Sequence, residues 1–220
     1  MSGGIRVKIC GITQPDDIAY LVRAGAAYAG LVFYPRSPRA LTPERARAIA
    51  VCAPPGLARV ALFVDAEDTT IETVLEQVPI DLLQLHGHES PDRVSELRAR
   101  FGLPVMKAVG IATEADLPAL TDYGRVADLL LVDAKPPPGA ALPGGNGLAF
   151  DWRLIAGRRW PVPWLLAGGL TPDNVAEAIR LTGARQVDVS SGVEREPGVK
   201  DPARIAAFLA AARDLPAAAG

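Results

Sequence analysis

Cysteine and histidine are scarce in this sequence, which contains two residues of each type. Cys10 and Cys52 lie far apart in the chain, and neither His86 nor His88 has a cysteine near it. This pattern does not match the spacing of zinc-binding motifs or the framework of a disulfide-rich domain. We therefore expect a reduced protein that holds no metal ion.

The sequence also lacks long apolar runs and blocks of like charge. No stretch approaches the roughly 18 apolar residues of a transmembrane helix, and the N-terminal MSGGIRVK lacks the apolar core of a signal peptide. The formal net charge of −2 is spread along the chain, which argues against nucleic acid as a partner. We expect a cytoplasmic monomer or homodimer without membrane or nucleic-acid partners.

Eight short apolar runs alternate with stretches of helical periodicity. The apolar runs are rich in Val, Ile or Leu and are bounded by turn residues, which is typical of buried strands. The predicted strands are 7–10, 30–33, 60–64, 82–85, 105–109, 129–132, 164–167 and 186–189. The predicted helices are 15–24, 43–51, 69–77, 91–100, 114–123, 172–181 and 202–213.

Several helix starts carry a capping signal. Thr42, Ser90 and Thr171 each precede a proline at the first position of a predicted helix, and Asp201 precedes Pro202 in the same way. A side-chain oxygen before an N1 proline is typical of a helix N-terminus. We therefore expect these four residues to cap helices.

Alternating strands and helices indicate a parallel α/β sheet. Eight such units favour a closed (β/α)8 TIM barrel over an open doubly wound sheet, and residues 10–13, CGIT, lack the GxGxxG of a dinucleotide-binding fold. No linker divides the chain, so we expect one barrel domain over residues 1–220, with 214–220 as a flexible tail. The Pro- and Gly-rich stretch 136–147 is expected to be a functional lid or a disordered loop.

Polar and reactive residues gather where the predicted strands end. In a (β/α)8 barrel the carboxyl ends of the strands build the active site. The candidates are Cys10, Tyr34, Arg36, Arg39, Asp65, His86, Asp133, Lys135, Gly168, Gly169, Ser190, Ser191 and Gly192. The glycines and serines of LAGGLTPDNV and VDVSSGVE match a phosphate cradle, in which backbone N–H groups approach an anion. The alternative is that these glycines only form tight turns.

Several motifs occur in an order that carries a family resemblance. These are RVKICGIT, GLVFYPRSPR, LLQLHG, LLVDAK, FDW, LAGGLTPDNV and VDVSSGVEREPGVKD. Together, from residue 5 to about residue 210, they resemble the phosphoribosylanthranilate isomerase family of tryptophan biosynthesis. The resemblance implies an aldose–ketose isomerase that performs an Amadori rearrangement on a small phosphosugar by general acid–base catalysis, with no metal or cofactor.

The resemblance also assigns roles to individual residues. It implies that Cys10 is the base and Asp133 the acid, and that Arg39 binds the anthranilate carboxylate, with Arg36 as the competing choice. The Cys10 thiol must then be partly deprotonated, helped by a nearby cation or by the phosphate-binding dipoles. The pKa of Asp133 must be raised by burial. His86 is expected either to contact the substrate or to serve as a structural histidine.

Two charged residues precede their strand ends by two positions. Lys8 and Asp188 therefore point to the same side of their strands as Cys10 and Ser190. The first and last strands are neighbours in a closed barrel. We predict that Lys8 and Asp188 form a buried ion pair inside it, mainly structural, whose charge biases Cys10.

Other functions remain open at this point. A Schiff-base aldolase could use Lys107 or Lys135 as its amine, and a sugar-phosphate binding barrel without catalysis would not need its thiol. Without the resemblance, Cys10 reads equally well as a small buried residue, and Asp133 reads as a cap or loop carboxylate. A histidine-pathway isomerase of this fold would be expected to carry aspartate where Cys10 stands.

Overall fold

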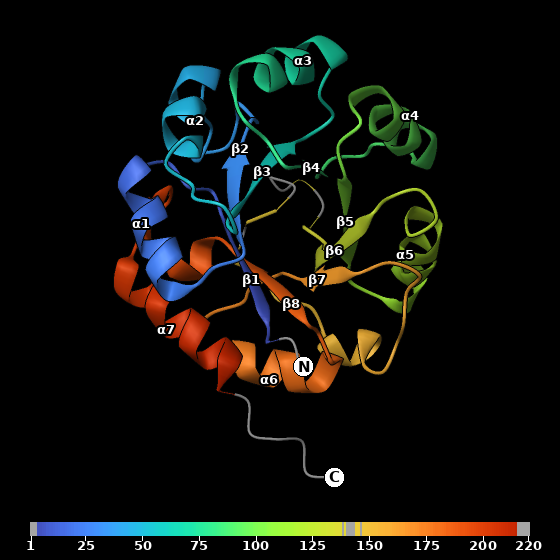
Figure 1. Ribbon diagram of the computed structural model, residues 1–220. Coiled ribbons are helices and arrows are strands. Elements are labelled where there is room, and N and C mark those ends of the chain that lie inside the picture. The colour runs from blue at the N-terminus through green and yellow to red at the C-terminus, as the bar shows by residue number, and fades with distance from the viewer. Residues whose placement is uncertain (1–3, 138, 140–143, 146, 215–220) are drawn as a thin grey trace.

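A computed structural model describes residues 4–137, 139, 144–145 and 147–214. Eight parallel strands close into a barrel in the order of the chain, with each strand bonded to the next and β8 bonded to β1 (Figure 1). The strands are β1 (Arg6–Cys10), β2 (Tyr28–Val32), β3 (Ala58–Phe63), β4 (Leu82–Leu85), β5 (Val105–Ile111), β6 (Leu129–Ala134), β7 (Trp164–Leu166) and β8 (Gln186–Val189). The predicted TIM barrel is confirmed.

Helices surround the strands and cover their outer face (Figure 1). They are α1 (Pro15–Ala24), α2 (Pro43–Ala50), α3 (Asp68–Gln77), α4 (Pro91–Phe101), α5 (Leu117–Tyr123), α6 (Val175–Thr182) and α7 (Pro202–Arg213). Short 3-10 turns lie at η1 (Glu114–Asp116), η2 (Trp152–Ile155) and η3 (Ser191–Val193), and β9 (Glu194–Glu196) pairs with β10 (Val199–Lys200). Within the described part of the chain, no helix has the length and apolar character to cross a bilayer.

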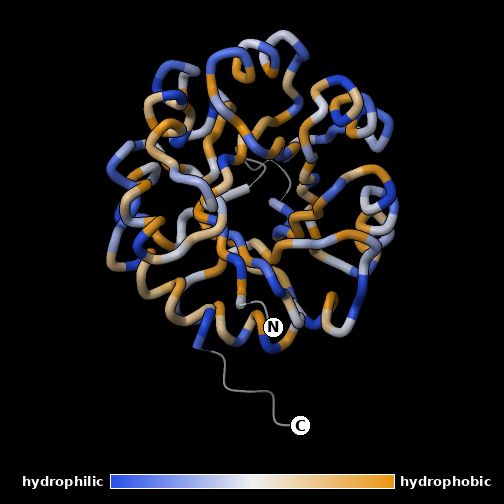
Figure 2. The backbone as a smooth tube through the Cα atoms, viewed as in Figure 1, coloured by the Kyte–Doolittle hydropathy of each residue, from blue (hydrophilic) through white to orange (hydrophobic). Residues whose placement is uncertain are grey.

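The core has two layers because strand side chains alternate between the faces of the sheet. Hydrophilic residues gather on the outer rim of the helices, and hydrophobic residues face the strands (Figure 2). The strand–helix layer holds most of the buried aliphatic side chains. The barrel interior is filled by Tyr28, Val60, Leu82, Met106, Ala108, Leu131, Leu165 and Ala167. A residue two positions from one of these on the same strand therefore also faces inward.

Three of the four predicted helix caps are confirmed. The side chains of Thr42, Ser90 and Asp201 each accept a backbone N–H in the first turn of α2, α4 and α7. The prediction for Thr171 was wrong, because α6 begins only after Asn174. The Asn174 side chain accepts the N–H of Thr171 at 2.8 Å, so the residues between them form a turn that leads into the helix.

The connections also differ from the predicted regular alternation of strands and helices. The described residues between β6 and β7 form the 3-10 turn η2 but no α-helix. The predicted helix 114–123 is divided into η1 and α5, where Pro118 lies at the start of the α-helical part. Residues 138, 140–143 and 146 of the predicted lid, and 215–220 of the predicted tail, lie outside the described residues.

The first and last strands meet at a polar seam. Lys8 and Asp188 are register partners on β1 and β8, and Lys8 Nζ lies 2.9 Å from Asp188 Oδ1. Both side chains are buried, so the predicted ion pair is confirmed. One step nearer the carboxyl ends of the strands, Ser190 Oγ donates to the Cys10 carbonyl at 3.0 Å.

Candidate active site

Cys10 and Asp133 line the same small cavity at the carboxyl ends of the strands. This cavity measures about 60 Å³, and Arg39, His86 and Ser190 also line it. Cys10 closes β1, and Asp133 lies in β6 two residues after Leu131, which packs inside the barrel. The alternation of the strands thus brings a thiol and a carboxyl group, distant in sequence, to one mouth.

A second cavity of about 40 Å³ adjoins the first and shares Asp133 and Ser190 with it. The small residues after β7 and β8 that were predicted as a phosphate cradle line this cavity: Gly168, Gly169, Ser190, Ser191 and Gly192. Gly168 and Gly169 have φ angles of +85° and +62°, a region that glycine adopts without strain. The first N–H groups of a helical turn such as η3 have no partner within the turn.

The environment of Cys10 combines burial with positive charge. Burial raises the pKa of its thiol above the usual value, and the Lys8 and Lys200 ammonium groups partly oppose that rise. Cys10 Sγ and Lys8 Nζ both lie next to Gly30, since a Cβ built on Gly30 would be 2.9 Å from the first and 3.2 Å from the second. The thiol and the ammonium group are therefore close to each other. The expected cation is therefore present, but in the unliganded protein burial outweighs it.

The Asp133 carboxyl group is held by two partners. Its Oδ1 accepts the backbone N–H of Ala134 at 2.8 Å, and its Oδ2 lies 3.2 Å from His86 Nε2. The side chains of Asp133 and His86 are each 11 % exposed, so the pair is largely shielded from solvent. His86 thus contacts the candidate acid directly.

Arg39 and Arg36 occupy different surroundings. Arg39 is buried, and its Nε and Nη2 donate to the two carboxylate oxygens of Glu194, each at 2.8 Å. Glu194 also accepts from Lys200 Nζ at 2.7 Å, which donates in turn to the Ser190 carbonyl at 3.1 Å. Arg36 is exposed and lines a wider cavity of about 580 Å³, which adjoins the Cys10 cavity and shares His86 and Asp133 with it.

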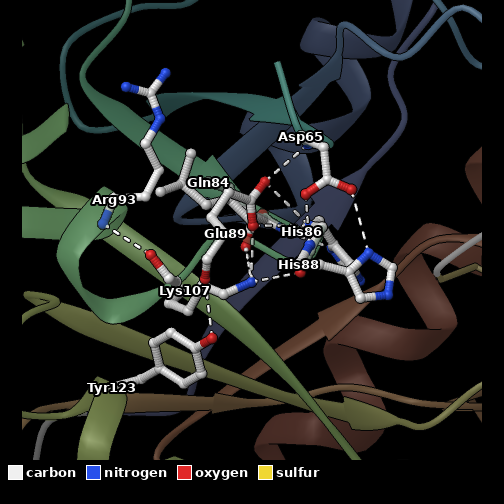
Figure 3. Close-up of polar contacts among 11 residues, drawn as sticks. Asp65, Gln84, His86, His88, Glu89, Arg93, Lys107 and Tyr123 are labelled. Atoms are coloured by element: carbon white, nitrogen blue, oxygen red, sulfur yellow. Dashed lines mark hydrogen bonds and ion pairs between the residues drawn. The ribbon is translucent and has the colours of Figure 1, made fainter. Parts of the chain in front are cut away.

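Lys107, the first candidate for a Schiff base, points away from the site. Its neighbours Met106 and Ala108 face the barrel interior, so Lys107 faces the helices. Its ammonium group donates to Glu89 Oε2 at 2.9 Å and to the Gly87 carbonyl at 2.7 Å, beside the ring of Tyr123 (Figure 3). A buried ammonium that is paired in this way is not a free amine nucleophile.

The remaining strand-end candidates lie at the rim. Lys135 pairs with Asp116 at 2.5 Å and is about half exposed. Asp65 has a positive φ of 46°, and its carboxylate accepts the His88 backbone N–H at 2.6 Å (Figure 3). The His88 side chain is 94 % exposed.

Sequence reasoning missed three residues of the site. Glu194 and Lys200 fall within the motif VDVSSGVEREPGVKD, but only the folding back of β9 and β10 brings them to Arg39 and Ser190. Gln84 lies in LLQLHG two residues before His86, and its polarity within a buried strand was the available signal.

Fold and site together define a (β/α)8 barrel in which a thiol and a carboxyl group line one cavity at the carboxyl ends of the strands. Comparison with known families identifies the particular kind. The family N-(5'phosphoribosyl)anthranilate (PRA) isomerase matches residues 7–211. The chain belongs to this family.

Individual relatives cover nearly the whole chain. The N-(5'-phosphoribosyl)anthranilate isomerase of a Cereibacter sphaeroides strain is 65% identical over 210 residues, which is 96% of this chain and 99% of that protein. The Paracoccus denitrificans enzyme is 62% identical over 208 residues, covering 94% and 97%. The Thermotoga maritima crystal structure has a TM-score of 0.85 at 40% identity and covers 96% of this chain and 100% of its own.

Two further structures of this family concern a bound ligand and an oligomeric state of those proteins. One isomerase was crystallised in complex with reduced 1-(o-carboxyphenylamino)-1-deoxyribulose 5-phosphate; it has a TM-score of 0.82 at 38% identity and covers 96% and 100% of the two chains. The Thermotoga maritima enzyme is described as dimeric in a structure of its monomeric forms.

Proposed function

We propose that this protein converts N-(5'-phosphoribosyl)anthranilate into 1-(2-carboxyphenylamino)-1-deoxyribulose 5-phosphate, a step of tryptophan biosynthesis. One observation carries the proposal: in a chain of this family, a thiol and a carboxyl group line one cavity that adjoins a glycine- and serine-rich cavity. An Amadori rearrangement needs an acid and a base around one sugar. The adjoining cavity supplies a place for the phosphate.

In the first step Asp133 acts as the acid. It gives its proton to the ring oxygen of the ribose, the bond between that oxygen and C1′ breaks, and the lone pair of the anthranilate nitrogen forms the C1′=N bond of an iminium. The carboxylate that remains accepts the Ala134 N–H. Its partial burial limits competition from bulk water.

In the second step the Cys10 thiolate acts as the base. It removes the proton from C2′, the C–H electrons form a C1′=C2′ bond, and the iminium electrons return to nitrogen. The resulting enolamine loses its hydroxyl proton and gains one at C1′ to give the ketone. The nearby ammonium groups of Lys8 and Lys200 favour the thiolate that this step requires.

Binding of the two anionic ends of the substrate is divided between the cavities. We assign the phosphate to the backbone around Gly169, Ser191 and Gly192, since small residues let N–H groups approach an anion. We assign the anthranilate carboxylate to Arg39 over Arg36. Glu194 accepts from Nε and Nη2 of Arg39. The remaining Nη1 is the Arg39 atom nearest to a Cβ built on Gly145, and Gly145 lines the same cavity as Cys10.

A turnover assay tests the proposal directly. Freshly prepared phosphoribosylanthranilate is offered to the wild type, Cys10→Ala and Asp133→Asn, and each variant is expected to lose at least about a hundredfold in kcat, the usual scale for general acid–base groups. Cys52→Ala is the matched control, because Cys52 is exposed and donates only to the Ala48 carbonyl. Wild type without turnover would refute the activity; active wild type with undiminished Cys10→Ala would refute the assignment of the base.

The monomer or homodimer state and the cytoplasmic location stay predictions. The dimeric state described for the Thermotoga maritima relative makes sedimentation of this chain the direct test of its assembly.

A further inference from the structure

Gln84 is a polar side chain enclosed in the barrel. It is completely buried in β4 and faces inward, because Leu82 two positions earlier packs in the interior cluster. Its Nε2 lies 2.9 Å from His86 Nδ1 (Figure 3), and its Oε1 has no hydrogen-bond partner among the described residues. A fully buried amide is costly unless it is hydrogen-bonded, so its contact with His86 calls for an explanation.

This contact bears on which nitrogen of His86 carries the proton. The amide nitrogen of Gln84 can only donate a hydrogen bond, so the His86 Nδ1 that receives it bears no proton. The ring proton of the neutral imidazole then lies on Nε2, because the hydrogen bond at one ring nitrogen sets the state of the other. Nε2 lies 3.2 Å from Asp133 Oδ2. His86 therefore presents an N–H, not a lone pair, at the ring nitrogen nearest to Asp133.

The imidazole ring has little room to leave this position. A Cβ on Gly144 would lie 2.5 Å from His86 Nε2 and 3.0 Å from Asp133 Oδ2, so the backbone of Gly144 packs directly over the contact. On the other side, Asp133 Oδ1 accepts the N–H of Ala134 at 2.8 Å. Oδ1 thus accepts an N–H, and Oδ2 lies within ion-pair distance of the His86 ring nitrogen.

We propose that Gln84 is a positioning residue for the general acid. It fixes His86 in the tautomer with its proton on Nε2, and this N–H together with that of Ala134 stabilises the carboxylate left when Asp133 gives its proton to the ring oxygen. Donors that lie next to the carboxyl group before the reaction need little reorganisation when the charge develops. The inference rests on the proposed function, in which Asp133 is the acid.

The tautomer can be measured in the wild-type protein without any catalytic assay. The chain has only two histidines, so ¹⁵N-histidine labelling gives two ring systems, and the variant His88→Gln assigns them. We expect His86 to show an unprotonated Nδ1 and a protonated Nε2. A proton on Nδ1 of wild-type His86 would overturn the inference, and it would leave the turnover of the wild type, and hence the proposed function, unaffected.

Two substitutions test the consequence for catalysis. Gln84→Glu places an acceptor opposite Nδ1, so Nδ1 becomes protonated; Gln84→Met removes the partner without adding charge. We expect at least about a tenfold loss of kcat in each, with KM within about twofold of wild type, because Gln84 does not line the cavities. Gln186→Met is the matched control, since Gln186 is also a buried barrel glutamine but bonds to Tyr28 at the start of β8.

The outcomes separate the inference from the proposed function. Reduced kcat in both Gln84 variants, a protonated Nδ1 in Gln84→Glu, and wild-type kcat and tautomer in Gln186→Met support the inference. Wild-type kcat in folded Gln84→Glu or Gln84→Met refutes it while the wild type still turns over substrate. If both variants fail to fold, the tautomer of the wild type decides.

Discussion

Replacing Lys8 by methionine tests the seam between β1 and β8. The two side chains of the Lys8–Asp188 pair are 0% and 9% exposed, so the substitution leaves a nearly buried carboxylate without its partner. Breaking such a pair from one side costs about 3–5 kcal/mol, because the remaining charge is uncompensated. For a chain of this size that corresponds to a fall in Tm of roughly 6–20 °C.

Denaturant unfolding followed by circular dichroism measures this cost. The double variant Lys8→Met/Asp188→Leu removes both charges and is expected to recover much of the lost stability. Burial alone lowers the pKa of Lys8, but the opposing effect of Asp188 and Cys10 raises it above its usual value. A raised pKa means that the stabilisation is present at neutral pH and is lost only as alkaline pH passes the pKa of the folded state.

The same substitution changes the reactivity of Cys10. Lys8 lowers the pKa of the Cys10 thiol against the larger effect of burial, so its removal raises that pKa further. Less thiolate is then present at a given pH, and the pH profile of alkylation by iodoacetamide shifts to higher pH. A Cys52→Ala background leaves Cys10 as the only thiol. An unchanged unfolding midpoint, or an alkylation profile that stays in place, would contradict our reading of the seam.

Two further substitutions follow from close contacts. Gly30→Ala places a Cβ 2.9 Å from the Cα and Sγ of Cys10, and we expect about 1–3 kcal/mol of destabilisation with lower kcat, measured by unfolding and turnover; wild-type kcat would show that the thiol need not stay in place. For Asp116, burial raises the pKa, but hydrogen bonds from Lys135 and two backbone N–H groups lower it to about 2. Asp116→Asn should therefore lower the free energy of unfolding at pH 7, and the gap in unfolding free energy between variant and wild type should shrink as the pH falls from 3.8 to about 2. A gap that stays constant over this range would contradict a lowered pKa of Asp116.

The residues that carry the site could be predicted wherever strand alternation decides their direction. Cys10 and Asp133 end or nearly end strands whose inward-facing positions follow from period two, and the pairing of Lys8 with Asp188 follows from closure of the ring. These predictions depend on backbone geometry that every parallel barrel shares. They needed no knowledge of loop conformation.

Contacts made by irregular segments could not be predicted in this way. The pairing of Arg39 with Glu194 depends on how the hairpin of β9 and β10 folds back over the barrel mouth. Likewise, Thr171 with Pro172 reads locally as a helix start, but the hydrogen bond to Asn174 delays the helix by three residues. Side-chain competition for backbone groups decides such boundaries, and several arrangements have similar local energies.

The seam between β1 and β8 also constrains how the protein folds during synthesis on the ribosome. Lys8 emerges early, yet its counter-ion lies 180 positions later, and so does the serine that anchors the carbonyl of Cys10. Until the final strand is available, a nascent barrel would have to keep that ammonium in water. β1 therefore cannot reach its final buried position before β8 has been synthesised, and the active site forms late in synthesis.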